Sequence, residues 1–241
     1  MHKYCIGTTL ALLCVATACR GSDTAEPLDI YAAASLAEAF PQIEPEARFN
    51  FGGSDELATQ IREGAPADVY AAASSKHPQE LFEEGLVEEP VTFAANRLVL
   101  IVPRANPAAI ESVEDILQPN TRLVVAAEGV PAGDYTRALL ATLGLSAALE
   151  NVVSNEDDVK GVATKVALGE ADAGFVYATD VAAVQERVRA IELPADPQPP
   201  IEYQVAVVRT SDDKVAARAF VEKLRSREGR EALARVGFGT P

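Results

Sequence analysis

Short polar breaks separate strand-like runs from helix-like runs along most of this 241-residue chain. The three most informative breaks are AAASL at 32–36, GGSDEL at 52–57 and VPAGDY at 130–135. Each places small residues with free backbone N–H groups or hydroxyls at the start of an expected helix, whose first turn carries unpaired donors and partial positive charge. Several such termini facing one point would form an anion site without lysine or arginine.

The alternation of strand and helix patterns predicts an α/β fold with mostly parallel sheets. Strands are expected at 28–32, 48–51, 69–72, 97–102, 123–126, 174–177, 191–193 and 203–208. Helices are expected at 36–40, 56–62, 78–84, 113–117, 135–143, 159–168, 180–188 and 214–235. In the first of these helices, Ser35 is the expected N-cap and Glu38 completes a capping box.

Two βα-rich segments predict two lobes. The first lobe would consist of residues 28–93 together with 205–241, because the C-terminal helices are expected to return to it, and the second of residues 94–204. In open α/β sheets a ligand lies at the carboxyl ends of the strands, where the three polar breaks fall. The expected binding site is therefore a cleft between the lobes.

The first 27 residues have the features of an export signal and a tether. The apolar stretch 6–18 is too short to span a membrane, and it ends in ATAC at 16–19. Small residues before Cys19 resemble a bacterial lipoprotein signal, so we expect cleavage after residue 18, lipid on Cys19 and a polar tether at 19–27. The alternative is a plain secretory signal. All three cysteines lie at or before position 19, so an intrachain disulfide in the exported chain is excluded.

Charge and composition argue against several function classes. The net charge is −15 and no basic patch is visible, which speaks against nucleic acid as a partner. The only histidine after the expected signal is His77, which we interpret as a surface-loop residue, and too few histidines and cysteines remain for a zinc site. The acidic pairs 157–158 and 212–213 are interpreted as helix caps and solvated side chains rather than cation ligands. These features favour binding over catalysis.

An ordered set of motifs carries a resemblance to a known family. The chain resembles the molybdate-binding solute receptors of bacterial ABC importers, which have a two-lobe, type II periplasmic-binding-protein fold. The motifs span residues 28–241 and are YAAASL at 31–36, GSDELATQI at 53–61, GAPADVY at 64–70, NRLVL at 96–100, VPAGDY at 130–135, GEADAGFVYATD at 169–180 and YQVAVV at 203–208.

The resemblance implies a set of ligand-binding residues. In that family the oxyanion is held by two serine hydroxyls, backbone N–H groups and one tyrosine hydroxyl. The matching positions are Ser35 and Ser54 for the serines, Ala132 and Val159 for the backbone donors, and Tyr177 for the phenol. The metal would arrive as molybdate or tungstate, not as a bare cation, and no cofactor is implied.

The resemblance also implies a cellular role and leaves alternatives open. The protein would be extracytoplasmic, held at the membrane by its N-terminal lipid or free in the periplasm, and a monomer that delivers its anion to an ABC-transporter permease. The same fold could instead bind sulfate, phosphate or another small anion. A more remote alternative is a serine hydrolase with Ser35 or Ser54 as nucleophile. Asp55 stands where relatives usually carry Ser or Gly, and we expect its side chain to point outward to water.

Overall fold

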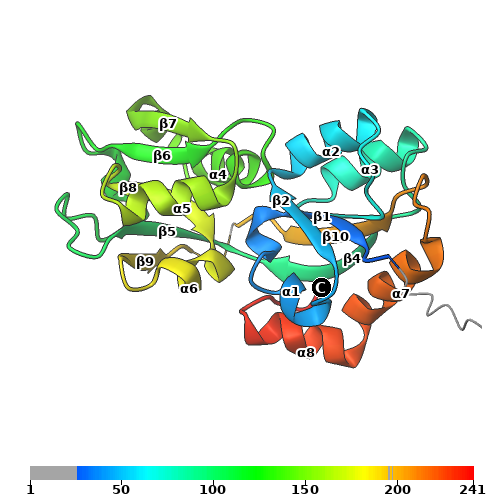
Figure 1. The fold of residues 1–241 in the computed structure, drawn as a ribbon. Coiled ribbons are helices and arrows are strands. Elements are labelled where there is room, and N and C mark those ends of the chain that lie inside the picture. The colour runs from blue at the N-terminus through cyan, green and yellow to red at the C-terminus, as the bar shows by residue number, and fades with distance from the viewer. Residues whose placement is uncertain (1–25, 195, 197) are drawn as a thin grey trace, which may run out of the picture.

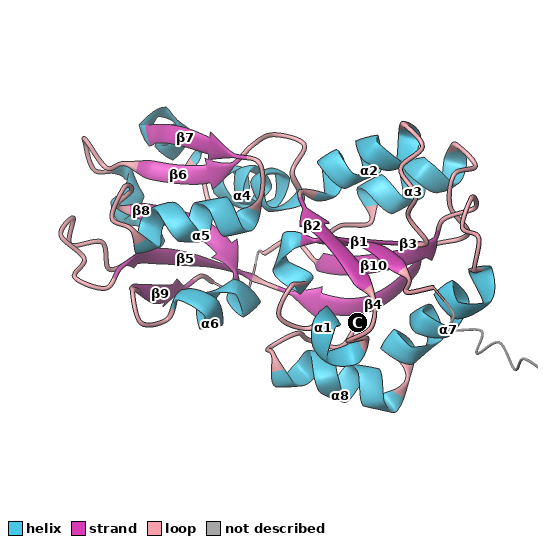
Figure 2. Cartoon of the chain, in the orientation of Figure 1, coloured by secondary structure: helices cyan, strands magenta, loops and turns pink. Residues whose placement is uncertain are grey.

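The computed structural model describes residues 26–194, 196 and 198–241. The expected signal at 1–18, Cys19 and most of the expected tether lie outside the described residues. The chain forms two lobes side by side, each built on its own five-stranded sheet (Figure 1). Helices flank both sheets (Figure 2), so the predicted two-lobe α/β fold is confirmed.

The first sheet has the strand order β2-β1-β3-β10-β4. Its strands are β1 (Asp29–Ala33), β2 (Arg48–Gly52), β3 (Val69–Ala72), β4 (Val91–Asn96) and β10 (Ile201–Val207). The second sheet has the order β7-β6-β8-β5-β9. Its strands are β5 (Leu98–Pro103), β6 (Leu123–Ala126), β7 (Val152–Glu156), β8 (Ala173–Tyr177) and β9 (Val188–Glu192).

Both sheets are mixed, but four strands of each run in one direction and only the fifth, β10 or β5, runs against them, so the sheets are mostly parallel as expected. In the first sheet β1 pairs in parallel with β2 and β3, whereas β10 pairs antiparallel with β3 and β4. In the second sheet β6 pairs in parallel with β7 and β8, whereas β5 pairs antiparallel with β8 and β9. The antiparallel strands β5 and β10 are the ones that enter each lobe from the other, so alternation of strands with helices did not reveal their direction.

The chain crosses between the sheets twice. It passes from β4 to β5 at Arg97, and it returns from β9 to β10 through residues 193–200. Residues 94–96 and 201–204, which we expected in the second lobe, therefore belong to strands of the first sheet.

Helices of the first lobe are the 3₁₀ helix η1 (Ala34–Leu36), α1 (Phe40–Ile43), α2 (Ser54–Arg62), α3 (Lys76–Glu83), α7 (Lys214–Arg225) and α8 (Arg227–Arg235). Helices of the second lobe are α4 (Pro131–Thr142), α5 (Val159–Ala167), α6 (Val181–Val184) and the 3₁₀ helices η2 (Val113–Leu117), η3 (Ser146–Asn151) and η4 (Ala178–Asp180). None of the helices formed by residues 26–194, 196 and 198–241 is long and apolar enough to cross a membrane.

The C-terminal helices pack on the first lobe, as expected. Phe220 of α7 lies edge-on to Phe40 of α1 with 5.4 Å between ring centroids, and Phe93 of β4 lies 5.9 Å from the same ring. All three rings are almost fully buried. Asp213 caps α7 by accepting a hydrogen bond from Ala216 N, and Asp158 caps α5 through Gly161 N, so one member of each acidic pair is a helix cap.

Several elements differ from the sequence prediction. The 3₁₀ helix η3 was not predicted, and the helix expected at 180–188 is replaced by η4 and the short α6. Strands β4 and β7 were not predicted, because β4 is only partly buried and β7 has mostly polar or half-exposed residues. The helix expected at 36–40 is replaced by η1 and the short α1. Ser35 is the middle residue of η1 and caps nothing, so the predicted capping box with Glu38 is wrong.

Candidate anion-binding site

A small cavity lies between the lobes at the carboxyl ends of their strands. Its lining residues are Ala33, Ala34, Ser35, Gly52, Gly53, Ser54, Ala73, Val130, Pro131, Ala132, Val159 and Tyr177. All five sequence-predicted site residues are among them. The space open to the centre of a water-sized sphere is about 20 Å³. That is far below the roughly 300–1,000 Å³ of pockets for drug-sized ligands, so the cavity suits a small ion.

Ser35 reaches the cavity from the short η1 helix that follows β1. Its side chain is 3% exposed, and its Oγ lies 2.8 Å from the hydroxyl oxygen of Tyr203. A serine hydroxyl has one proton to donate and two lone pairs. Ser35 can donate to a bound anion only if the Tyr203 hydroxyl is the donor in the contact between the two side chains.

Ser54 is the first residue of α2, and Gly53 occupies the N-cap position. Its Oγ accepts a hydrogen bond from the backbone N–H of Ala73 at 3.1 Å. Because this contact uses a lone pair, the hydroxyl proton of Ser54 is left for the cavity. Ser54 thus supplies its side chain to the site instead of capping its own helix.

Ala132 and Val159 lie in the first turns of two second-lobe helices. Ala132 is the second residue of α4 after Pro131, and Val159 is the first residue of α5. Backbone N–H groups in a first turn have no acceptor within the helix and carry partial positive charge. Gly133 lets α4 approach the end of β6, because a Cβ there would lie 2.0 Å from the carbonyl oxygen of Ala127.

Tyr177 is the last residue of β8 and is 1% exposed. Among the described residues, its hydroxyl oxygen is buried without a hydrogen-bond partner. Burial, with a smaller contribution from nearby Tyr203, raises the pKa of Tyr177 well above its ordinary value. The phenol therefore keeps its proton at neutral pH and is a donor that awaits an acceptor.

Polar contacts between the lobes surround the cavity. His77 Nε2 lies 3.0 Å from the carbonyl oxygen of Gly129, and Lys76 Nζ lies 3.4 Å from Asp134 Oδ2. On another part of the cleft, Lys160 Nζ lies 3.3 Å from Glu38 Oε1. The two lobes therefore contact each other through these polar pairs, and the cavity lies between them.

His77 is not the surface-loop residue that we expected. It is the second residue of α3 and only 6% exposed. Since the Gly129 carbonyl can only accept, the imidazole donates through Nε2–H. Nδ1 lies 3.4 Å from Glu80 Oε2. The histidine joins the lobes and is absent from the cavity wall.

Asp55 also contradicts the expectation of an outward side chain. Its Oδ1 is buried and has no hydrogen-bond partner among the described residues. Its carboxylate faces the other lobe, because a Cβ on Gly129 would lie 4.0 Å from Oδ2. Closure of the lobes covers this first-turn side chain, which sequence reasoning treated as part of an isolated helix.

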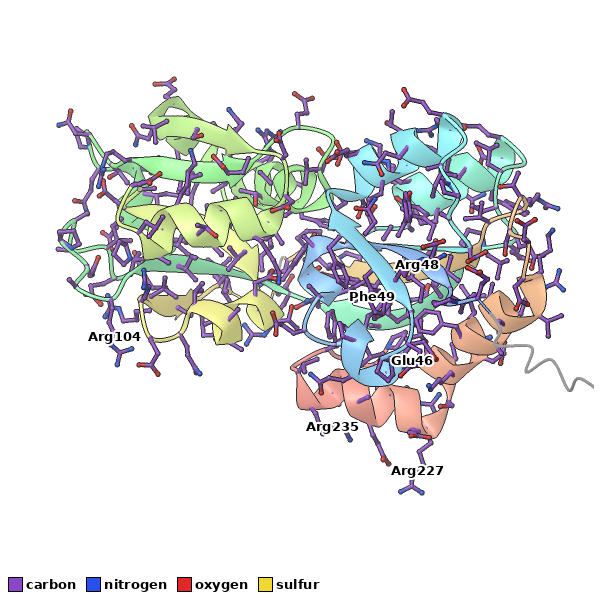
Figure 3. All side chains as sticks on the ribbon, viewed as in Figure 1. Glu46, Arg48, Phe49, Arg104, Arg227 and Arg235 are labelled. Carbon is purple, nitrogen blue, oxygen red and sulfur yellow. The ribbon has the colours of Figure 1, made fainter. Side chains whose placement is uncertain are left out.

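The cavity wall carries no formal charge. Its lining side chains, all from the described part of the chain, include no Lys, Arg, His, Asp or Glu. Labelled arginines such as Arg104, Arg227 and Arg235 project from the periphery of the lobes, away from the cleft (Figure 3). Any attraction for an anion must come from neutral hydroxyls and helix N-termini.

Sequence reasoning assigned no role to Tyr203 or Asn96. Tyr203 is fully buried in β10 beside Ser35, and Asn96 ends β4 with its Nδ2 3.4 Å from the Tyr203 hydroxyl oxygen. The available signal was a tyrosine that alternates with the polar residues Glu202 and Gln204 in β10, a pattern typical of a side chain on the buried face of a strand. Its partner Ser35 is 168 positions away, so the contact itself could not be inferred.

Comparison with known proteins agrees with the fold. Residues 24–239 match the family model of bacterial extracellular solute-binding proteins. The chain is 35% identical over 227 residues to the molybdate-binding protein ModA of Mycobacterium tuberculosis, covering 90% of this chain and 86% of that protein.

Two further matches extend the comparison. The chain is 30% identical over 223 residues to the putative ABC transporter substrate-binding lipoprotein YvgL of Bacillus subtilis, covering 88% and 85% of the two chains. A solved substrate-binding domain of a putative molybdenum ABC transporter from Clostridium difficile matches with a TM-score of 0.67 and 32% identity, covering 89% of this chain and 99% of that one. The chain therefore belongs to the family of bacterial extracellular solute-binding proteins.

Proposed function

We propose that the protein binds molybdate or tungstate in the interlobe cavity and delivers the anion to the membrane permease of an ABC transporter. The observation that carries the proposal is a small, uncharged interlobe cavity lined by hydrogen-bond donors. Ser35, Ser54 and Tyr177 supply hydroxyls, and Ala132 and Val159 supply first-turn N–H groups. The relatives named for molybdate and molybdenum support the same ligand class.

A tetrahedral oxyanion without protons matches such a cavity chemically. It offers only acceptors, and each hydrogen bond to a charged group contributes about 1.5–3 kcal/mol. Five or more of these bonds offset the desolvation of a dianion, which is severe when partners are missing. Local dipoles do this against the negative net charge of −15.

Selectivity follows from the same donors. A protonated phosphate would bring a hydrogen into a cavity where no acceptor faces it, and this leaves a buried donor unsatisfied. Sulfate is also a proton-free tetrahedral dianion but is smaller, so only the size of the cavity discriminates against it. Sulfate is therefore the rival ligand that a test must include.

The test is isothermal titration calorimetry of residues 20–241 with molybdate, tungstate, sulfate and phosphate. We expect binding of molybdate and tungstate that is tighter than binding of sulfate, and no binding of phosphate. Ser35→Ala and Ser54→Ala should each weaken molybdate binding by about 1.5–3 kcal/mol, which is about 10- to 150-fold. Ser146→Ala, at an exposed serine of the second lobe, is the matched control. Absence of molybdate and tungstate binding would overturn the proposal.

We propose that the protein binds its anion and does not catalyse a reaction on it. The hydrolase alternative needs a base beside Ser35 or Ser54, yet the neighbours of these hydroxyls are the Tyr203 phenol and the Ala73 N–H. His77 donates to Gly129 on another part of the cleft. Ester hydrolysis that Ser35→Ala or Ser54→Ala abolishes would contradict this assignment.

We also propose that the protein is exported, acts as a monomer and carries lipid on Cys19. The match to extracellular solute-binding proteins and to a protein named as a lipoprotein supports this location. Labelling of cells with a radioactive fatty acid should mark the wild-type protein and not Cys19→Ser. Equal labelling of both proteins would contradict lipidation, and release of both into the medium would indicate a plain secretory signal.

A further inference from the structure

A chain of polar groups runs behind Ser35 toward the place where the lobes are joined. The Tyr203 hydroxyl lies 2.8 Å from Ser35 Oγ. Asn96 Nδ2 lies 3.4 Å from the same tyrosine oxygen and 2.9 Å from Thr179 Oγ1. Tyr203 is fully buried and Thr179 is 6% exposed, so these groups cannot rely on bulk water for partners.

The hydrogen-bond network assigns the direction of each donor. The backbone N–H of Arg97 donates to Asn96 Oδ1 at 2.9 Å, which fixes the orientation of the amide. The two Nδ2 hydrogens of Asn96 then point to Thr179 and to the Tyr203 oxygen. Because the tyrosine oxygen accepts from Asn96, we infer that its own hydrogen is donated to Ser35 Oγ, which lies 2.8 Å away.

This order of donors decides what Ser35 offers to the cavity. When Tyr203 donates to Ser35, the serine proton is left to point toward a bound anion. The opposite order would direct the serine proton to Tyr203 and turn a lone pair toward the anion. Burial raises the pKa of Tyr203 well above its ordinary value, so the phenol keeps its proton for this contact.

We propose that Tyr203 and Asn96 are positioning residues of the anion site, which act through Ser35 without touching the ligand. Tyr203 keeps the Ser35 hydroxyl aligned as a donor, and Asn96 keeps Tyr203 aligned. The inference rests on the proposed function, because it presupposes an anion in the cavity.

Asn96 and Tyr203 lie beside the two crossings between the lobes. Asn96 is the last residue of β4, at one crossing between the lobes, and Tyr203 is in β10 after the return crossing. Thr179 belongs to η4 of the second lobe, so the Asn96–Thr179 hydrogen bond spans the two lobes. The amide that aligns Tyr203 is therefore also held by a second-lobe group beside the crossing at Arg97.

Tyr203→Phe removes the hydroxyl and keeps the packing of the ring. The ring lies edge-on to Phe238, Tyr177 and Phe93, with centroids 5.2, 5.8 and 6.2 Å away, and these contacts remain in the variant. We expect about 3- to 10-fold weaker molybdate binding in calorimetry, as for loss of one neutral hydrogen bond. Tyr31→Phe, on β1 of the same sheet and only partly buried, is the matched control and should bind like wild type.

A double-mutant cycle with Ser35→Ala separates positioning from a general structural role. If Tyr203 acts through Ser35, Tyr203→Phe should change affinity less than twofold in the Ser35→Ala background. An equal loss in both backgrounds, or no loss in the wild-type background, would overturn the inference. If Tyr203→Phe fails to fold, Asn96→Ser, at a half-buried position, can be combined with Ser35→Ala in an equivalent double-mutant cycle. Failure of the unmodified protein to bind molybdate or tungstate would instead overturn the proposed function, and this inference with it.

Discussion

Gly53 controls how closely the lobes approach, so Gly53→Ala should impair closure over the ligand. A Cβ at this position would lie 2.5 Å from the carbonyl oxygen of Asp157, a backbone atom of the other lobe, and 2.8 Å from Asp55 Oδ1. The first distance is about 0.9 Å short of the 3.4 Å at which ordinary contact begins. The carboxylate can rotate away, but the Asp157 carbonyl can move only with its lobe.

The magnitude follows from hydrogen-bond geometry. An opening of about 0.9 Å stretches a typical N–H···O distance from about 2.9 Å to about 3.8 Å, beyond hydrogen-bonding range. The donors affected are those that the second lobe contributes, Ala132, Val159 and Tyr177. Loss of even one such bond to a charged ligand weakens binding by about 1.5–3 kcal/mol, which is about 10- to 150-fold.

Calorimetry with molybdate measures this loss, and thermal unfolding without ligand provides the control for folding. The clash with Asp157 exists only between closed lobes, and the Asp55 carboxylate can rotate away within its own lobe, so Gly53→Ala should not lower the unliganded melting temperature. Gly239→Ala is the matched substitution, because its Cβ would meet nothing closer than 3.6 Å. Wild-type affinity in Gly53→Ala would refute the reasoning that the closed arrangement seen here is the one that holds the ligand.

Two further predictions concern His77 and Asp180. His77→Phe keeps a ring but removes the Nε2–H donor to the Gly129 carbonyl across the cleft. Molybdate affinity should therefore fall about 2- to 10-fold. Unchanged affinity would show that this hydrogen bond does not favour closure of the lobes. Burial raises the pKa of Asp180 from 3.8 to about 7. Between these pH values the folded protein keeps a proton on Asp180 that the unfolded protein has released. The free energy of unfolding therefore falls as the pH rises through this window. In urea unfolding, the free energy of unfolding of the wild type should fall by about 2–3 kcal/mol relative to that of Asp180→Asn between pH 5 and pH 8. A difference between the two proteins that does not change with pH would contradict the raised pKa.

The sequence predicted those parts of the site that depend on local patterns. Ser54, Ala132 and Val159 follow strand ends and begin helices, and Tyr177 ends a strand whose residues are all buried. Strand ends in α/β sheets converge on one edge, so their convergence could be expected from pattern alone. The structure places these four residues, with Ser35, around one cavity.

The parts that sequence reasoning missed depend on contacts between distant segments. Ser35 was interpreted as a helix cap, but its hydroxyl is engaged by Tyr203, and this partner is set by the pairing of β10 with β3. His77 and Asp55 were assigned to the surface, because only lobe closure brings Gly129 over them. A local helix or loop pattern contains no information about what the opposite lobe covers.

The most direct test of the account is a crystal structure of the tungstate complex with anomalous diffraction from tungsten. One strong anomalous peak is expected in the interlobe cavity. The oxygens of the anion should lie about 2.5–3.2 Å from the hydroxyls of Ser35, Ser54 and Tyr177 and from the backbone nitrogens of Ala132 and Val159. A peak outside the cavity, or an anion held there by a lysine or arginine side chain, would contradict the claim that neutral donors alone bind it.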